Sequence, residues 1–254
     1  MAQKAGRLKD ERASRAGEAP IELSASDNEG RARVGNQDAD VAGRVGGMSA
    51  AHVRSGAAMI VHELPIAGLK LIQLDVHGDA RGFFVERFNA DRFRAAGLPY
   101  QFVQDNHSRS AVGVVRGLHY QYAPAQGKLV SVMRGRILDV AVDLRSGSPT
   151  FAQHFACELS DLNGLLLWIP GGFAHGFSVI GDESADLHYK VDAMYNAGGE
   201  SGISWNDAQL AVPWGVADPV LSARDQGLES LEDYCCHPKF HWVREAEATK
   251  IAIR

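Results

Sequence analysis

The sequence predicts an all-β fold, an antiparallel barrel or sandwich with only a few short helices. Short extended runs rich in branched aliphatic residues follow one another closely along most of the chain. Turn signals separate these runs, and no long helical pattern lies between them. Closely spaced strands without intervening helices favour antiparallel pairing and argue against an α/β arrangement.

The first predicted elements lie between residues 69 and 97. Residues 69–76 are apolar and rich in strand-forming residues, Gly78-Asp79 is a turn signal, and residues 83–88 resume as a strand. Residues 89–97 form the one convincing helix, because an asparagine can cap its start and a glycine can close its end. We therefore expect two strands followed by one short helix.

The later elements are all predicted strands. They cover residues 112–115, 118–122, 128–133, 137–144, 154–159, 165–169, 175–180 and 187–191, with turn signals such as Ser146-Gly147 and Asn163-Gly164 between them. The alternation is clearest after Arg136, where Leu138 and Val140 share one face and Asp139 the other. This pattern predicts a half-buried strand.

Composition divides the chain near residue 58. All the Phe, Trp and Tyr residues lie at or beyond Phe83, and residues 1–58 are dominated by Ala, Gly and charged side chains. Such a segment cannot bury enough apolar surface to offset the entropy of ordering it. We therefore expect a disordered N-terminal extension over residues 1–58 and one domain over residues 59–254.

Charge and cysteine content bound the class of function. The 254 residues carry a formal net charge of −5 without a block of Lys and Arg, which gives no reason to expect a nucleic-acid partner. No apolar run approaches the roughly 20 residues that a membrane-spanning helix needs. Three cysteines, two of them adjacent, do not suggest a disulfide framework. We expect a cytoplasmic protein with no membrane partner.

Two motifs resemble those of the cupin superfamily of jelly-roll barrels. The first runs through His119, Gln121 and Lys128, and the second is the segment that ends at His175. In metal-binding cupins these positions hold three histidines and a glutamate, so Gln121 and Lys128 replace two ligands. An ammonium group beside a divalent cation is repulsive, and we therefore expect a barrel without a metal site.

Strand alternation places three polar side chains on core-facing positions. His119 shares its face with Gln121, Lys128 shares its face with Val130, and Tyr189 lies on the face of its apolar neighbours. A buried lysine without a partner is costly, so an inward Lys128 suggests a cavity for an anion. The alternatives are that Lys128 ends its strand and reaches solvent, and that His119 and Tyr189 are structural core residues.

Ten ordered segments between about residues 60 and 233 together resemble the dTDP-4-dehydrorhamnose 3,5-epimerase family. The segments include Arg81-Gly82-Phe83-Phe84, Gln104-Asp105-Asn106-His107-Ser108, Arg116-Gly117-Leu118-His119, Gln126-Gly127-Lys128, Tyr189-Lys190, Glu200-Ser201-Gly202 and Ala223-Arg224-Asp225. This family inverts the two carbons that flank the C4 ketone of a nucleotide-linked 6-deoxy-4-keto sugar, in the route to dTDP-L-rhamnose. The resemblance implies a cupin-type jelly roll, an isomerase activity and no cofactor.

The resemblance also implies roles for four catalytic residues. His119 is the base that removes the α-proton, and Asp225 orients its imidazole. Lys128 stabilises the enolate oxygen, and Tyr189 returns a proton from the opposite face of the sugar. Nothing in the sequence apart from the resemblance points to Asp225.

The implied substrate-binding set is larger. It comprises Arg81, Glu86, Gln104, Asn106, Arg116, His175, Tyr195, Glu200 and Arg224. Arginine suits a diphosphate because its guanidinium group can pair two oxygens at once; surface positions for Arg81 and Arg224 are the alternative. Strand facing also suggests that Asp139 partners His175. Members of the family are usually dimers that exchange strands, so we expect a homodimer.

Some departures and alternatives stay open. The segment 206–208 lacks the proline usual in the family, and Pro213-Trp214 reverses the usual order. Some relatives invert only one carbon, so a single-carbon epimerase is one alternative. A metal-dependent cupin oxygenase and a cupin that binds sugar nucleotides without catalysis are the others.

Overall fold

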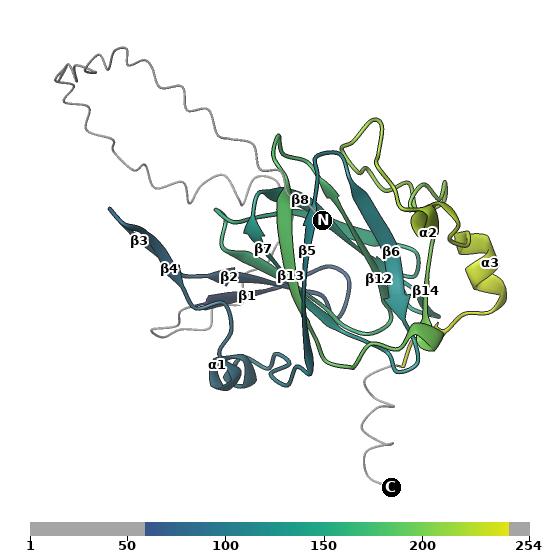
Figure 1. Cartoon of the computed structure of the whole chain (residues 1–254). Coiled ribbons are helices and arrows are strands. Elements are labelled where there is room, and N and C mark those ends of the chain that lie inside the picture. Colours follow the sequence, from purple (N-terminus) through teal and green to yellow (C-terminus); the bar gives the residue numbers. More distant parts are fainter. Residues whose placement is uncertain (1–58, 244–254) are drawn as a thin grey trace, which may run out of the picture. The chain divides into compact units, whose positions relative to one another are not determined.

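The computed structural model describes residues 59–243, and the predicted N-terminal extension lies outside this range. Two antiparallel sheets face each other (Figure 1). The six-stranded sheet has the order β1 (Met59–Glu63), β2 (Lys70–Leu74), β11 (Leu165–Ile169), β7 (Lys128–Arg134), β13 (Ala185–Val191) and β5 (Gln104–Ser110). The five-stranded sheet has the order β10 (His154–Ser160), β8 (Arg136–Asp143), β12 (Phe173–Val179), β6 (Val115–Gln121) and β14 (Glu200–Gly202). The all-β prediction is confirmed.

The remaining elements are short. A hairpin of β3 (Val76–Asp79) and β4 (Gly82–Val85) projects from the sheets, and β9 (Arg145–Ser146) pairs in parallel with β15 (Phe240–His241) (Figure 1). The helices are α1 (Ala90–Ala95), α2 (Ala223–Gln226), α3 (Leu231–Cys236) and the 3₁₀ turn η1 (Ala197–Gly199). None of the helices in the described range is long and apolar enough to cross a membrane.

The main core lies between the two sheets. Leu71, Val130 and Leu167 of the six-stranded sheet pack with Ile137 and Phe177 of the other, and all five are buried. Each side chain alternates with an outward neighbour, as strand geometry requires. Because β7, β13 and β12 contribute to this core, the polar residues that interrupt it on these strands lie inside the molecule.

Two smaller clusters cover the outer faces. Phe93 of α1 packs with Trp168 on the outside of the six-stranded sheet. On the outside of the five-stranded sheet, Val140 packs with Trp214 and with Tyr234 of α3. The segment that departs from the family pattern, around Trp214, therefore lies behind this sheet.

The structure corrects the prediction for strand β8. We expected a half-buried strand with Asp139 on the face opposite Leu138 and Val140, but Asp139 is fully buried, and so is Asp143 on the same face. The strand lies between β10 and β12 in its sheet, and its opposite face is covered by the cluster that contains Tyr234. A central strand covered on both faces has no solvent side, so its acidic residues must find partners inside.

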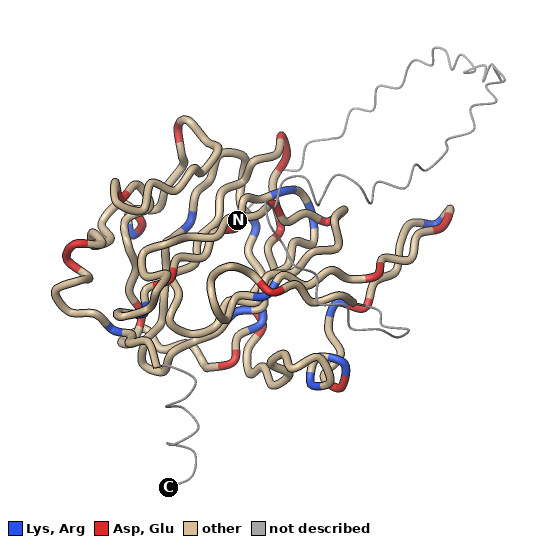
Figure 2. The backbone as a smooth tube through the Cα atoms, turned by 180° about the vertical axis from the view of Figure 1, so that it is seen from behind, with Lys and Arg blue, Asp and Glu red and all other residues tan. Residues whose placement is uncertain are grey.

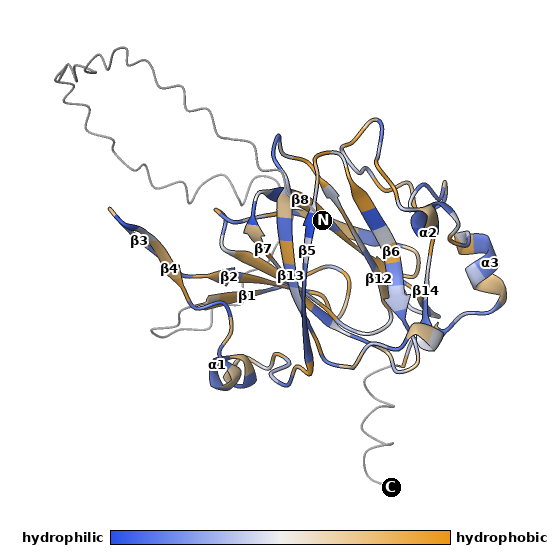
Figure 3. Ribbon diagram, viewed as in Figure 1, coloured by the Kyte–Doolittle hydropathy of each residue, from blue (hydrophilic) through white to orange (hydrophobic). Residues whose placement is uncertain are grey.

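Several element boundaries also differ from the prediction. The predicted turn at Gly78-Asp79 lies at Ala80-Arg81, and the strand expected over residues 83–88 ends at Val85. The helix prediction is confirmed, with the side chain of Asn89 capping α1. The strands β1, β5, β9, β14 and β15, the helices α2 and α3 and the turn η1 were not expected. Strand β5 consists of polar residues alone, and Figure 3 shows it in hydrophilic colours.

Glycines bring β6 and β12 unusually close together. A Cβ atom at Gly117 would lie 2.6 Å from Gly176 Cα, so neither strand tolerates a side chain at this crossing. The register shifts between His175 and Phe177, which is a bulge of the kind that redirects side chains. His119 and His175 are opposite one another on these adjacent strands, next to the bulge.

Candidate active site

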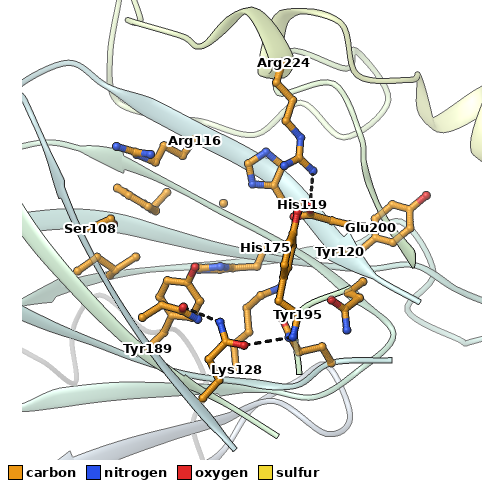
Figure 4. A pocket seen from close by; sticks show the side chains of 17 residues that line it. Ser108, Arg116, His119, Tyr120, Lys128, His175, Tyr189, Tyr195, Glu200 and Arg224 are labelled. Atoms are coloured by element: carbon orange, nitrogen blue, oxygen red, sulfur yellow. Dashed lines mark hydrogen bonds and ion pairs between the residues drawn. The ribbon is translucent and has the colours of Figure 1, made fainter. Parts of the chain in front are cut away.

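A cavity of about 400 Å³ opens between the two sheets (Figure 4). Most of the predicted site residues line it, namely Gln104, Asn106, Arg116, His119, Lys128, His175, Tyr189, Tyr195, Glu200 and Arg224. Strands β6, β12 and β14 supply one wall, and β5, β7 and β13 supply the other. Residues from nearly the whole length of the domain thus meet at one place.

His119 forms the first of two His–Asp pairs. Its Nε2 lies 2.5 Å from Oδ1 of Asp225, a buried residue in α2. Ser222 caps α2 and donates from its hydroxyl to Oδ2 of Asp225 at 2.9 Å, so both carboxylate oxygens are fixed. Burial raises the pKa of Asp225, but the hydrogen bonds from His119 and Ser222 outweigh it and bring the pKa below its ordinary value.

The Ser222-x-x-Asp225 spacing is a helix-start signal that the sequence analysis overlooked. It explains locally why Asp225 faces β6. Ser222 caps the first turn, and the backbone N–H of Asp225 donates to the serine hydroxyl at 3.1 Å. The turn therefore holds the carboxylate at a fixed angle to the His119 ring.

His175 forms the second pair. Its Nε2 lies 2.7 Å from Oδ1 of Asp139, and both residues are buried. Among the described residues, Oδ2 of Asp139 is the one buried side-chain polar atom without a hydrogen-bond partner. The pairing suggested by strand facing is therefore confirmed, and one buried carboxylate holds His175 from behind.

Lys128 lies on the opposite wall, at the first residue of β7. Burial lowers the pKa of Lys128 to about 8, although the charges of Glu200, Asp139 and Asp192 raise it. The residue lines the cavity, so the alternative that its side chain escapes to solvent is wrong. An ammonium group that is poorly solvated attracts developing negative charge strongly.

Tyr189 lies on the same sheet as Lys128. It is half-buried on β13, with Asn106 of β5 opposite it in register. Burial raises the pKa of Tyr189, and the charge of Glu200 raises it further. The phenol therefore keeps its proton near neutral pH and can donate it into the cavity.

The mouth of the cavity carries three linked polar residues. Oε2 of Glu200 accepts from the Tyr195 hydroxyl at 3.0 Å and pairs with the Arg224 guanidinium at 2.9 Å. The three residues come from a loop, from β14 and from α2, and Figure 4 shows Glu200 and Arg224 close together. Arg116 lies farther along the same wall, and its Nε donates to the Ser110 hydroxyl at 2.9 Å.

Two predicted binding residues lie outside the cavity of their own chain. Arg81 is at the tip of the hairpin β3–β4, where it pairs with Asp79 and is exposed. Glu86 pairs with Arg92 of α1 at 2.9 Å. Neither lines the cavity, so the prediction that they bind substrate is not met within a single subunit.

The cavity also contains residues that were not predicted, among them Ser108, Phe177 and Leu187. Ser108 shares the inward face of β5 with Gln104 and Asn106. All seven residues of β5 are polar, so neither an apolar run nor an alternation of apolar and polar residues could indicate a strand. Gln104 Nε2 donates to Asn106 Oδ1 at 2.8 Å on this face.

Taken together, the groups suit proton transfer next to an oxygen that becomes negative. An imidazole backed by a carboxylate faces a phenol and an ammonium group across the gap between two sheets. Within residues 59–243 no cluster of three His, Cys, Asp or Glu side chains has the geometry of a metal site. The histidine Nε2 atoms are engaged with carboxylates.

Comparisons with known proteins point the same way. The sequence profile of the family described as dTDP-4-dehydrorhamnose 3,5-epimerase matches residues 63–233. A Pseudomonas aeruginosa protein of the same description is 49% identical over 177 residues, which cover 69% of this chain and 97% of that protein. The crystal structure of a 3,5-epimerase from Legionella pneumophila in complex with dTDP-4-keto-L-rhamnose has a TM-score of 0.70 and 44% identity, covering 73% of this chain and all of that one.

A relative with narrower activity is also similar. A dTDP-4-dehydrorhamnose 3-epimerase from Streptomyces niveus is 39% identical over 170 residues, which cover 66% of this chain and 82% of that protein. Its identity to this chain is lower than that of the Pseudomonas aeruginosa protein.

Proposed function

The chain belongs to the dTDP-4-dehydrorhamnose 3,5-epimerase family and is an epimerase, and from this we propose that it converts dTDP-4-dehydro-6-deoxy-D-glucose into dTDP-4-dehydro-L-rhamnose. The reaction inverts C3 and C5, on either side of the C4 ketone, and leads toward dTDP-L-rhamnose. The observation that carries the proposal is the placement of His119 and Tyr189 on opposite sheets around one cavity.

The first step is removal of a proton from the carbon next to the ketone. His119 takes this proton at Nδ1, because its Nε2–H donates to Asp225. The C–H electron pair moves into the C3–C4 or C4–C5 bond, and the ketone becomes an enolate. Asp225 keeps its negative charge and stabilises the imidazolium that forms.

The second requirement is stabilisation of the enolate oxygen. Lys128 supplies a positive charge from the six-stranded sheet, and burial keeps that charge poorly screened. His175 lines the cavity on the facing sheet and is held by Asp139. A fixed cation at this oxygen lowers the barrier because the negative charge develops only during the reaction.

Inversion requires that the proton return from the other face of the sugar. Tyr189 is a protonated phenol on the sheet opposite His119. It donates its proton to the carbon, and the enolate collapses to the ketone. Only protons move in this scheme, so it needs no metal and no redox cofactor.

The mouth of the cavity would bind the nucleotide. Arg116 and Arg224 can pair with diphosphate oxygens, and Arg224 would exchange its contact with Glu200 for the substrate. Gln104, Asn106 and Tyr195 provide an amide pair and an aromatic ring for the nucleoside. We assign this set to substrate binding and the deeper groups to catalysis.

We further propose a homodimer in which the hairpin β3–β4 enters the cavity of the partner. Phe83 and Phe84 are exposed by 56% and 70%, which is unusual for aromatic side chains on a projecting hairpin. Both signs of charge occur at its tip (Figure 2). Arg81 and Glu86, which are distant from their own cavity, would then contact the substrate bound by the other subunit.

The two alternative enzyme activities would require different groups in the cavity. A metal-dependent oxygenase would need a third ligand beside His119 and His175, but the amide of Gln121 bonds to backbone groups and Lys128 carries a positive charge. A single-carbon epimerase would use the same base and acid. The number of carbons that exchange protons with solvent distinguishes it from the proposed activity.

Replacing the base tests the assignment directly. His119→Ala should slow entry of solvent deuterium into the sugar by roughly 10²–10⁴-fold, the usual contribution of a general base. Its matched control is His107→Ala, because His107 is an exposed histidine on the outer face of β5. Deuterium entry at the wild-type rate in His119→Ala would refute the role of His119.

A further inference from the structure

Gln121 lies on the wall of the cavity and has no assigned role. It is the last residue of β6, two positions after His119 and on the same face. Its side chain is only 3% exposed. A buried amide needs hydrogen-bond partners, and the identity of these partners indicates what the residue does.

The amide of Gln121 bonds to backbone groups of two loops. Its Nε2 donates to the carbonyl oxygens of Pro124 at 3.0 Å and Met194 at 3.1 Å. Its Oε1 accepts from the backbone N–H of Asn196 at 2.8 Å. Both N–H donors are used and the oxygen is occupied, so the amide is engaged in holding the chain.

Two of these three partners flank Tyr195 on either side. Tyr195 lies in the loop between β13 and η1, and its backbone N–H donates to Gln104 Oε1 at 3.1 Å. Its hydroxyl donates to Glu200 at 3.0 Å, at the mouth of the cavity. A neighbouring glutamine, Gln126, donates to the Ala193 carbonyl at 2.7 Å. Side-chain amides therefore fasten this loop almost residue by residue.

We propose that Gln121 is a positioning residue that fixes the 194–196 segment and thereby holds Tyr195 ready to receive the nucleotide. The inference rests on the proposed function, since Tyr195 is assigned there to the nucleoside. Tyr195 itself is 55% exposed, so little packing restrains it and the hydrogen bonds of its loop must do so. A loop fixed before binding loses less entropy when the ligand arrives.

A glutamine suits this task better than other residues of its size. One planar amide presents two donors and an acceptor, which match the Met194 carbonyl and the Asn196 N–H on either side of one residue. Glutamate would keep the bond to Asn196, but its second carboxylate oxygen would face the two carbonyl oxygens and could not donate to them. Methionine has similar length and can make none of the three bonds.

Steady-state kinetics of Gln121→Met test the proposal. We expect KM for the dTDP sugar, and Kd for dTDP measured by calorimetry, to rise about tenfold, the scale of one or two lost buried hydrogen bonds. The kcat should change by less than about twofold, because the loop does not contact the reacting carbons. The matched control is Gln73→Met. Gln73 fastens the Asn163 loop to β2 outside the cavity, and its replacement should leave both constants unchanged.

A double-mutant cycle separates positioning from direct contact. If Gln121 acts through Tyr195, then Gln121→Met should add little to the dTDP Kd in a Tyr195→Ala background. Additive losses, or a fall in kcat without a rise in KM, would overturn the proposal. Gln121→Glu provides a second variant in case Gln121→Met does not fold. A wild-type protein without turnover would refute the proposed function, whereas the dTDP affinities would still decide the role of Gln121.

Discussion

At the scale of single residues, the opposition of His119 and Tyr189 distinguishes inversion from simple proton exchange. The proposed base, His119, is on the five-stranded sheet and the phenol of Tyr189 is on the six-stranded sheet. A site with a base alone would remove a proton and return it to the same face. An imidazole and a phenol on opposite sides of the cavity allow a proton to leave one face of the sugar and return to the other. Replacing the imidazole should stop proton exchange, whereas replacing the phenol should stop inversion.

Tyr189→Phe should uncouple exchange from inversion. The variant lacks the proton donor on the far face, whereas His119 and Asp225 are unchanged. We expect solvent deuterium to enter the substrate while formation of inverted product falls by roughly 10²-fold or more. NMR in deuterated water measures both rates in one sample. Equal losses of exchange and inversion would show that Tyr189 does not act as the separate acid.

Lys128 should link activity and stability to pH in opposite directions. Its pKa in the folded protein is about 8, below the ordinary value of 10.5. Activity that needs the ammonium group should fall as the pH rises through about 8. The unfolded chain holds the proton over a wider range, so the free energy of unfolding should rise between about pH 8 and 10.

Lys128→Met isolates these effects. The variant should lose most of its turnover, on the scale of a removed oxyanion donor, about 10²–10³-fold. It should also be more stable than the wild type near neutral pH and lack the rise in unfolding free energy above pH 8. Urea unfolding at several pH values measures the latter. A wild-type stability that falls in this window relative to the variant would contradict the assignment.

At the scale of secondary structure, β8 places two buried carboxylates on one face for different purposes. Asp139 holds His175 beside the cavity. Asp143 accepts from Arg145 at 2.8 Å and from Ser148 at 2.6 Å, outside the cavity. Burial raises the pKa of Asp143, but these hydrogen bonds outweigh it and lower the pKa. One carboxylate serves the site and the other the fold.

Asp139→Asn and Asp143→Asn should therefore have different effects on activity and on stability. Asp139→Asn keeps the shape but removes the charge behind His175, and we expect kcat to fall roughly 10–100-fold with little loss of stability. Asp143→Asn removes the negative charge that pairs with the guanidinium of Arg145. We expect a loss of about 3–5 kcal/mol in unfolding free energy with kcat unchanged. Kinetics and denaturant unfolding of both variants provide the check. The same loss of kcat in both would show a general disturbance of the strand.

Much of the strand pattern was predictable because apolar periodicity reports burial. The segment 165–169 was predicted with its observed bounds, and β7 and β13 were predicted within a few residues. Strand β5 was missed because its seven residues are all polar. Its inward face lines a cavity, where apolar packing does not select the residue types. Failure of the pattern at this strand is thus a consequence of function.

The prediction that β8 is half-buried was wrong for a related reason. Alternation distinguishes the two faces of a strand but does not say whether either meets solvent, and β8 is covered on both faces. For the site, alternation predicted that His119, Lys128 and Tyr189 face inward, whereas Asp225 needed the family resemblance. Contacts between α2 and β6 join residues more than a hundred positions apart, which no local pattern encodes.

At the scale of the whole molecule, the proposed exchange of the hairpin β3–β4 would place residues of two subunits in one active site. Arg81 and Glu86 lie outside the cavity of their own chain, although the family resemblance assigns them to substrate binding. A dimer that exchanges hairpins reconciles the two facts. The complete site would then contain residues from both subunits.

Mixed dimers test this arrangement. Arg81→Ala and His119→Ala homodimers should both be impaired, the first in KM and the second in kcat. Unfolding and refolding the two variants together should restore part of the activity. In a mixed dimer, the subunit that keeps His119 receives the hairpin of the subunit that keeps Arg81, so one of its two sites is intact. Light scattering gives the mass of the dimer. A monomer in solution, or no restored activity in verified mixed dimers, would refute the exchange.

We propose that one base and one opposing acid invert two carbons without a metal. Proton NMR of dTDP-4-dehydro-6-deoxy-D-glucose with the chelator-treated protein in deuterated water tests it most directly. We expect deuterium to enter at both C3 and C5 and the inverted sugar to accumulate. Exchange at one carbon alone would make this a single-carbon epimerase, and no exchange at either position would refute the proposed activity.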